Sequence, residues 1–129
     1  MSFATWIEEF YPVPADDCPR EQALEHSILK WTGLLPENLE KHGVQKYASY
    51  VQDPNGIDWL RIDATSCALC SHYWRQKWGC KHEVDPCPIM RVTGNTCDAR
   101  YLEFIRTDRV TPMLDLLRQV KEALDALQA

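Results

Sequence analysis

Five cysteines crowd into 31 residues in the middle of this chain, and they limit its structure more than any other feature. The run begins with Cys67-Ala-Leu-Cys70 and continues with Cys80, Cys87 and Cys97. A Cys-x-x-Cys pair directs two sulfurs at one metal ion, and zinc takes four soft ligands in a tetrahedron. We therefore predict a structural metal site here, with zinc as the metal.

The spacing leaves a choice of four ligands among the five cysteines. Cys67, Cys70 and Cys87 are the first candidates, and Cys80 and Cys97 compete for the fourth position. Nine, six and nine residues separate the successive cysteines after Cys70, so the second half lacks the tight pair of a zinc ribbon.

Other donors and another cofactor fit the same segment. His72 and His82 are nitrogen donors close to the cysteines. Cysteine followed by proline, as in Cys87-Pro88, also recurs at iron–sulfur ligands, so an iron–sulfur cluster is the alternative cofactor.

A thiol redox site is a third interpretation. Thr65 or Ser66 would cap a helix that begins at Cys67, and the N-terminus of that helix would favour a thiolate, as in thioredoxin-like sites built on a pair such as Cys67 and Cys70. However, no strand–helix–strand pattern surrounds the pair, and the other cysteines would have no role. Cys18 lies apart in a predicted linker, where we expect it to react with thiol reagents before Cys67.

Composition and charge set the cellular context. No apolar run approaches the ~20 residues that cross a bilayer, and the N-terminus lacks the basic segment of a signal peptide. These features predict a cytoplasmic protein with no membrane partner, in which thiols stay reduced. The 14 Lys and Arg against 19 Asp and Glu give a net charge of -5, which argues against a general nucleic-acid coat.

A local basic and aromatic segment nevertheless spans residues 73–82. It interleaves three aromatic residues with three cations, which are Tyr73, Trp74, Trp78, Arg75, Lys77 and Lys81. Such a segment has the ingredients of a nucleic-acid surface that stacks on bases and contacts phosphates. The favoured alternative is that the aromatic rings pack around the metal.

Helices are predicted for most of the N-terminal third. Apolar residues spaced i, i+3, i+4 and i+7 predict a helix over 3–10. A second helix, capped by Asp16 or Asp17, is expected to end at Gly33, and a third covers residues 36–43. We expect a linker between the first two.

A β-hairpin follows these helices. Two predicted strands, 47–52 and 57–63, are joined by the turn sequence Asp-Pro-Asn-Gly at 53–56. Upstream, His26 and His42 lie on charged helical stretches and are expected to face solvent.

The chain ends in a predicted amphipathic helix over 111–128. Its apolar positions step by four and three residues, namely Met113, Leu117, Val120, Leu124 and Leu127. Two heptads are too few for a coiled coil, so the helix is expected to pack on its own domain rather than form a dimer seam.

Three short motifs follow one another along the chain. They are Ser27-Ile-Leu-Lys30-Trp31, Ser66-Cys-Ala-Leu-Cys70 and Cys87-Pro-Ile-Met-Arg-Val-Thr-Gly94, followed by a final cysteine. Over residues 21–115 this arrangement resembles a group of small uncharacterised cysteine-rich proteins of tailed phages and prophages. In that group two residues separate the Cys-Pro cysteine from the cysteine before it, whereas six residues separate Cys80 from Cys87 in this chain. The resemblance implies a phage-encoded accessory factor in the bacterial host cytoplasm.

These features predict a small α+β domain over residues 1–129. An N-terminal helix and linker cover residues 1–20, and helices with a β-hairpin cover 21–63. An irregular cysteine-rich metal-binding region covers 64–100, and a C-terminal helix covers 111–128.

The predicted function is that of a non-enzymatic, zinc-stabilised binding protein that engages and modulates a host protein. No catalytic motif is present in the sequence. Nucleic-acid binding through residues 73–82 and thiol redox chemistry through Cys67 and Cys70 are the alternatives.

Overall fold

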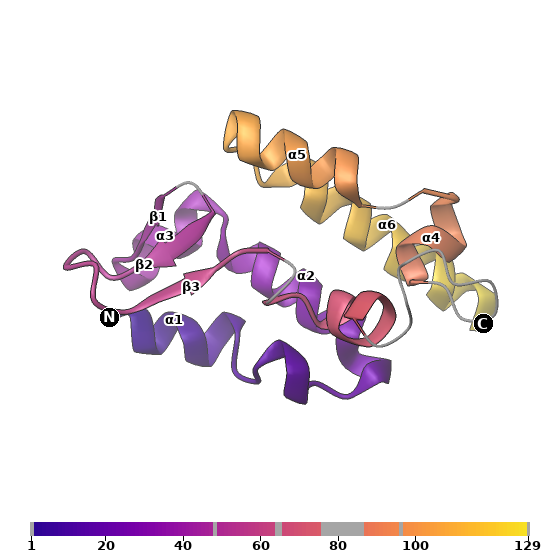
Figure 1. Cartoon of the computed structure of the whole chain (residues 1–129), viewed down its shortest axis with the longest axis horizontal. Helices are drawn as coiled ribbons and strands as arrows, with labels where there is room; N and C mark the ends of the chain where they lie inside the picture. Colours follow the sequence, from indigo (N-terminus) through magenta and orange to yellow (C-terminus); the bar gives the residue numbers. More distant parts are fainter. Residues whose placement is uncertain (1, 48, 64–65, 76–86, 96, 129) are drawn as a thin grey trace.

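Six α-helices and a three-stranded antiparallel sheet make up the computed structural model, which describes residues 2–47, 49–63, 66–75, 87–95 and 97–128 (Figure 1). This mixture of helices with one small sheet in a single domain confirms the predicted α+β class. None of the described helices combines the length and apolar character needed to span a bilayer.

The elements follow one another in a simple order. The α-helices are α1 (Phe3–Phe10), α2 (Ala23–Gly33), α3 (Pro36–His42), α4 (Pro88–Thr93), α5 (Asp98–Thr107) and α6 (Thr111–Gln128). The strands β1 (Gln45–Tyr47), β2 (Tyr50–Gln52) and β3 (Trp59–Arg61) lie between α3 and a π-helical segment, η4 (Cys70–Arg75).

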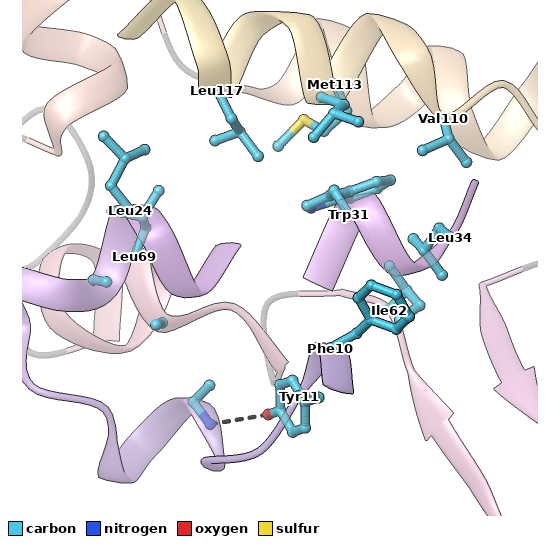
Figure 2. Packing of buried hydrophobic residues seen from close by; sticks show 14 of the residues in the cluster. Phe10, Tyr11, Leu24, Trp31, Leu34, Ile62, Leu69, Val110, Met113 and Leu117 are labelled. Carbon is cyan, nitrogen blue, oxygen red and sulfur yellow. Dashed lines mark hydrogen bonds between the residues drawn. The ribbon is translucent and has the colours of Figure 1, made fainter. Parts of the chain in front are cut away.

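Helix α2 is the centre of the arrangement. It packs against α1 on one side and against α6 on the other, and α4 and α5 pack on α6 in turn (Figure 1). Trp31 of α2 meets Phe104 of α5 edge to face, with ring centroids 4.8 Å apart. Figure 2 shows the same Trp31 facing Met113 of α6. The core is therefore built from residues that lie far apart in the sequence.

Helix α1 has the predicted boundaries, because its N-terminus is capped and its apolar face is buried. The Ser2 hydroxyl accepts the Thr5 N–H at 3.3 Å, and the Thr5 hydroxyl oxygen accepts the Ser2 N–H at 2.8 Å, which completes a capping box. Trp6 is fully buried, and its indole N–H donates to the Gly33 carbonyl at 2.9 Å. A Cβ atom on Gly33 would lie 2.5 Å from the Phe10 ring, so the contact between α1 and α2 requires glycine there.

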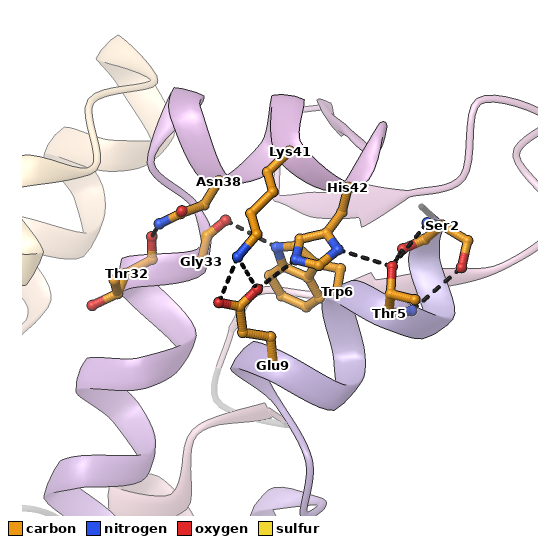
Figure 3. Close-up of polar contacts among 9 residues, drawn as sticks. All are labelled: Ser2, Thr5, Trp6, Glu9, Thr32, Gly33, Asn38, Lys41 and His42. Carbon is orange, nitrogen blue, oxygen red and sulfur yellow. Dashed lines mark hydrogen bonds and ion pairs between the residues drawn. The ribbon is translucent and has the colours of Figure 1, made fainter.

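A buried histidine ties α1 to α3 (Figure 3). The ring of His42 contacts the Thr5 hydroxyl through Nδ1 at 2.8 Å and donates from Nε2 to the Glu9 carboxylate at 2.6 Å. Lys41 also donates to Glu9, at 2.9 Å. We call Thr5, Glu9, Lys41 and His42 the α1–α3 polar cluster. The prediction that His42 faces solvent is wrong, because these partners satisfy both of its ring nitrogens inside the protein.

The predicted linker is packed into the structure. Tyr11 and Ala15 are buried, and the Tyr11 hydroxyl accepts the Ala15 N–H at 2.9 Å (Figure 2). His26 packs edge to face on Tyr11 and donates from Nε2 to the Val13 carbonyl at 2.6 Å, so the prediction that it faces solvent is also wrong. Asp16 and Asp17 belong to a 3₁₀ turn, and the N-cap position of α2 is Gln22 instead.

The sheet has one strand more than predicted. The predicted strand 47–52 is not one strand. Tyr47 ends β1 and Tyr50 begins β2, and these two residues lie opposite each other in the antiparallel pairing of β1 with β2. The predicted turn is present, with the Gly56 N–H donating to the Asp53 carbonyl at 2.8 Å and a positive φ of 74° at Gly56. The third strand pairs with β2.

The C-terminal helix packs on its own domain through most of the predicted seam. Met113, Leu117 and Val120 are buried, whereas Leu127 is 80% exposed. The two helices before it, α4 and α5, have no counterpart in the prediction. Helix α4 begins with Pro88 and ends at Gly94 in the left-handed conformation, both of which are standard boundary signals.

Candidate metal centre

Four of the five predicted ligands lie around one small cavity. Cys67, Cys70, Cys87 and Cys97 line a space of about 20 Å³ between α2, α6 and the segments that carry the cysteines. The fifth, Cys80, lies outside the described residues. The remaining lining residues are Ser27, Trp31, Leu69, Ile89, Met113 and Leu117. We call this space the cysteine cavity.

Local structure explains how three separate segments deliver these thiols. Cys67 and Cys70 stand at the start of the π-helical turn, where the Ser71 N–H donates to the Cys67 carbonyl at 2.9 Å. Cys87 occupies the N-cap position of α4 and Cys97 that of α5. The predicted cap of a helix at Cys67 is wrong for Ser66, whose hydroxyl instead bonds back to the Asp63 carbonyl at 3.3 Å, and Thr65 lies outside the described residues.

A buried lysine places a cation next to the thiols. Lys30 is 1% exposed, and its ammonium donates to the Ser66 carbonyl at 2.9 Å and to the Ser66 hydroxyl at 3.3 Å. Burial lowers the pKa of Lys30, whereas the nearby Cys67, Cys70 and Asp63 raise it. The two hydrogen bonds to Ser66 satisfy part of the polar head group of Lys30, as the burial of a polar group requires.

Cys67 is the thiol most strongly affected by these surroundings. Its pKa falls to about 5, chiefly because the Cys70 side chain donates a hydrogen bond to it, against an opposing effect of burial, and also because of the Lys30 charge. The Cys70 backbone N–H adds a contact to the Cys67 sulfur at 3.2 Å. These surroundings favour the thiolate of Cys67, which is the form that binds metals.

Ser27 is an unusual buried polar group in the cavity wall. Its side chain is 1% exposed and lies close enough to Cys67 to favour the thiolate. However, its hydroxyl has no hydrogen-bond partner of normal length among the residues that the structure describes. A buried hydroxyl without a partner costs about 1–3 kcal/mol.

The fit to a metal ion can be tested against this geometry. As the side chains stand, no three His, Cys, Asp or Glu residues in the described part of the chain form a group that could hold a metal ion. In a four-cysteine zinc site each sulfur lies about 2.3 Å from the metal, so the four thiols of the cavity would have to draw together around it. Zinc and an iron–sulfur cluster both stay predictions.

The spare donors that the sequence suggests are placed only in part. His72 donates from Nε2 to the Cys18 carbonyl at 2.6 Å, and His82 lies outside the described residues. Cys18 itself is buried, and burial raises its pKa, so the premise that it lies in an exposed linker is wrong, while the order in which Cys18 and Cys67 react with thiol reagents stays a prediction.

Most of the basic and aromatic segment 73–82 is not covered by the described residues, which omit 76–86 and the side chains of Trp74 and Arg75. Tyr73 is buried, its hydroxyl accepts a hydrogen bond from Arg20 at 3.1 Å, and the Arg20 guanidinium lies 5.0 Å from the centre of its ring. The Tyr73 ring therefore packs inside the protein against Arg20 and does not lie on an open surface.

Sequence reasoning missed the roles of Ser27 and Lys30. Together with Trp31 they stand at i, i+3 and i+4 in α2, which places them on one helical face, toward the cysteine cavity. The signal that would have found them is a lysine within the apolar face that carries Leu24 and Trp31. The same three residues are part of the sequence motif Ser27-Ile-Leu-Lys30-Trp31.

Comparison with models of known protein families, with characterised proteins and with solved structures gives no match to this chain. The resemblance to phage and prophage proteins therefore stays a prediction.

Proposed function

We propose that this chain is a non-enzymatic binding protein whose cysteine-bearing segments are held to the helical core by one zinc ion. The observation that carries the proposal is that Cys67, Cys70, Cys87 and Cys97, from three separate segments, line one cavity. Four thiolates complete the coordination of zinc and leave no position for water or substrate, which is typical of structural sites.

The size and charge of the cavity support zinc over a cluster. A space of about 20 Å³ is close to that of one or two water-sized spheres, which suits a single ion better than a cluster of several iron and sulfur atoms. Four thiolates around one Zn²⁺ carry a net negative charge, which the buried Lys30 ammonium beside them would offset. The Ser27 hydroxyl would gain a sulfur acceptor in the same site.

The proposed partner is another protein. The burial of Tyr73 removes one of the three aromatic rings that nucleic-acid stacking through residues 73–82 would use, and the net charge of -5 repels phosphates. The resemblance to phage and prophage proteins supports a host protein in the bacterial cytoplasm as the partner.

Elemental analysis of protein purified without oxygen tests the metal. We expect about one zinc per chain and no visible absorption band. Cys67→Ser and Cys97→Ser should lose the metal, whereas Cys18→Ser, outside the cavity, should keep it. Cys80→Ser tests whether Cys80 rather than Cys97 is the fourth ligand, and we expect this variant to keep the metal as well. A chain without metal, with a melting temperature unchanged by a chelator, would contradict the proposal, and a brown protein would favour iron–sulfur.

Thiol redox chemistry is the second candidate, favoured by the hydrogen bond between Cys70 and the Cys67 thiolate. We expect no disulfide reductase activity above background from the metal-loaded protein, because zinc would occupy both thiols. Rapid alkylation of Cys67 at acidic pH in the protein as purified would instead favour the redox role.

A further inference from the structure

Helix α2 places one hydroxyl in the wall of the cysteine cavity and gives it nothing to bond with. Ser27 is 1% exposed and lines the cavity, and its hydroxyl has no hydrogen-bond partner among the residues that the structure describes. Buried polar groups in proteins are ordinarily paired, because leaving one unpaired is unfavourable. A buried donor at the edge of a cavity therefore points to an acceptor that forms when the cavity is filled.

Other hydroxyls in the helices show what Ser27 could have done instead. Three threonines each donate to the carbonyl four residues earlier in the same helix, at 2.7 Å, namely Thr32 in α2, Thr93 in α4 and Thr107 in α5. This backbone bond is the ordinary local choice for a hydroxyl on a helix. Ser27 makes no such bond to Ala23, so its donor stays available to the cavity.

The side chains around the cavity offer this donor few acceptors other than sulfur. Most of the wall is apolar, and the indole N–H of Trp31 can only donate. The thioether of Met113 is a weak acceptor. The four cysteine sulfurs that share the wall become strong acceptors as thiolates, because hydrogen bonds to an ionised group are the stronger kind.

Cys67 is the sulfur that the surroundings favour as the acceptor. The pKa of Cys67 is lowered chiefly by the Cys70 side chain, and the nearby Ser27 hydroxyl adds to the effect. The Cys70 backbone N–H already contacts the Cys67 sulfur at 3.2 Å. A bond from Ser27 would bring the same sulfur a further donor, from a helix that carries no cysteine.

We infer that Ser27 is a positioning residue of the metal centre, whose hydroxyl donates to the Cys67 sulfur when the four thiols draw together around the ion. The inference rests on the zinc site proposed above and adds a role for α2, which supplies none of the ligands. Outer hydrogen bonds orient a ligand atom, and removing one typically weakens metal affinity by about 10–100-fold. The bond would also tie the Cys67 segment to the central helix of the core.

The test compares Ser27→Ala with Thr32→Ala in the full chain. Both variants remove a hydroxyl from α2, but Thr32 does not line the cavity. Competition with a chromophoric chelator measures the affinity for Zn²⁺, which should fall by about 10–100-fold in Ser27→Ala. With Co²⁺ in place of Zn²⁺, the sulfur-to-cobalt charge-transfer band of Ser27→Ala should move to longer wavelength, because a sulfur without this hydrogen bond gives up its electrons more easily. Thr32→Ala should match the wild type in both measurements.

Thermal melts separate this role from simple packing. Without metal, Ser27→Ala should melt no lower than the wild type, because it loses only an unpaired hydroxyl. The rise in melting temperature on adding Zn²⁺ should be smaller than in the wild type, because a weaker ligand stabilises the folded state less. A hydroxyl with only a packing role would leave that rise unchanged.

Each contrary result overturns the inference. Equal Zn²⁺ affinity of Ser27→Ala and the wild type would do so while leaving the zinc site in place, and equal losses in Ser27→Ala and Thr32→Ala would show a general effect on α2. A lower melting temperature of metal-free Ser27→Ala would show that the hydroxyl has a different partner. A wild type that binds neither Zn²⁺ nor Co²⁺ would overturn the zinc site as well.

Discussion

Two polar clusters flank helix α2, and they are completed in different ways. In the α1–α3 polar cluster, His42 finds Thr5 and Glu9, so every polar atom of its ring has a partner from the chain itself. In the cysteine cavity, the Ser27 hydroxyl has no hydrogen-bond partner among the described residues, and the buried Lys30 amine lies near several thiols. The α1–α3 polar cluster is completed by the protein's own side chains, whereas the cysteine cavity is the place where we propose a zinc ion.

Removal of Trp6 tests whether the two regions are independent and should have the largest effect. Trp6→Ala deletes a fully buried indole next to the α1–α3 polar cluster and its hydrogen bond to Gly33, so we expect a loss of about 3–5 kcal/mol in the free energy of unfolding. Metal content should be unchanged, because Trp6 does not line the cysteine cavity. Chemical denaturation with elemental analysis measures both. Loss of metal from folded Trp6→Ala would show that the two regions are coupled.

Replacement of Lys30 should disturb the cavity. Lys30→Met leaves the Ser66 carbonyl without its buried donor, which should cost about 1–3 kcal/mol of stability. In metal-free protein it should also raise the pKa of Cys67, because the Lys30 charge helps to lower it. The ultraviolet absorption of the thiolate as a function of pH measures this change. An unchanged Cys67 titration would show that the Lys30 charge does not contribute to the lowered pKa of Cys67.

Two hydroxyl deletions compare the regions directly. Thr5→Ala removes hydrogen bonds to Ser2 and His42 and should cost about 1–2 kcal/mol. Ser27→Ala removes a buried hydroxyl that has no hydrogen-bond partner among the described residues, so in metal-free protein it should raise stability, by up to about 1–3 kcal/mol. Thermal melts of both variants, each with and without chelator, measure the difference. A cost for Ser27→Ala as large as that for Thr5→Ala in metal-free protein would remove the distinction between the two regions.

Acid should act on His26 before it acts on Glu9. Burial lowers the pKa of His26 below 6.5, so the unfolded chain binds more protons in that window and stability falls as the pH drops below 6.5. Hydrogen bonds from Lys41 and His42 lower the pKa of Glu9 below 4.5, so its contribution is present above that pH and is lost as the pH falls through the lowered value. His26→Gln should flatten the first phase only, as measured by unfolding between pH 7 and pH 3. A first phase unchanged in His26→Gln would assign it to another group.

Local signals in the sequence predicted the fold well where they act within a few residues. The apolar spacing of α1, the Pro36 start of α3 and the Asp53–Gly56 turn all depend on neighbours in the chain, and all are present. The solvent exposure of histidines failed for the opposite reason. His26 and His42 are buried by partners 13 and 33 residues away, which no local pattern encodes.

The candidate site shows the same division. The Cys-x-x-Cys spacing singled out Cys67 and Cys70, but spacing could not choose between Cys80 and Cys97. Cys97 joins the others because α4 and α5 pack on α6, an arrangement set by tertiary contacts. The buried Lys30 escaped notice because a lysine on a helix is ordinarily at the surface.

Gly33 has a further consequence for how this chain can vary. The sequence marks it as a helix stop, yet its more demanding task is to leave room, since the Phe10 ring occupies the space where any side chain would begin. A single added methyl group at position 33 would act as a wedge between α1 and α2 and displace the N-terminal helix with its aromatic residues. We therefore expect a saturation screen to accept only glycine at position 33. At Gly56 the space around the residue is open, so the screen should accept other residues there, each strained only by the positive φ of the turn. The absence of a side chain at residue 33 is thus a condition for the packing of helix α1 against helix α2.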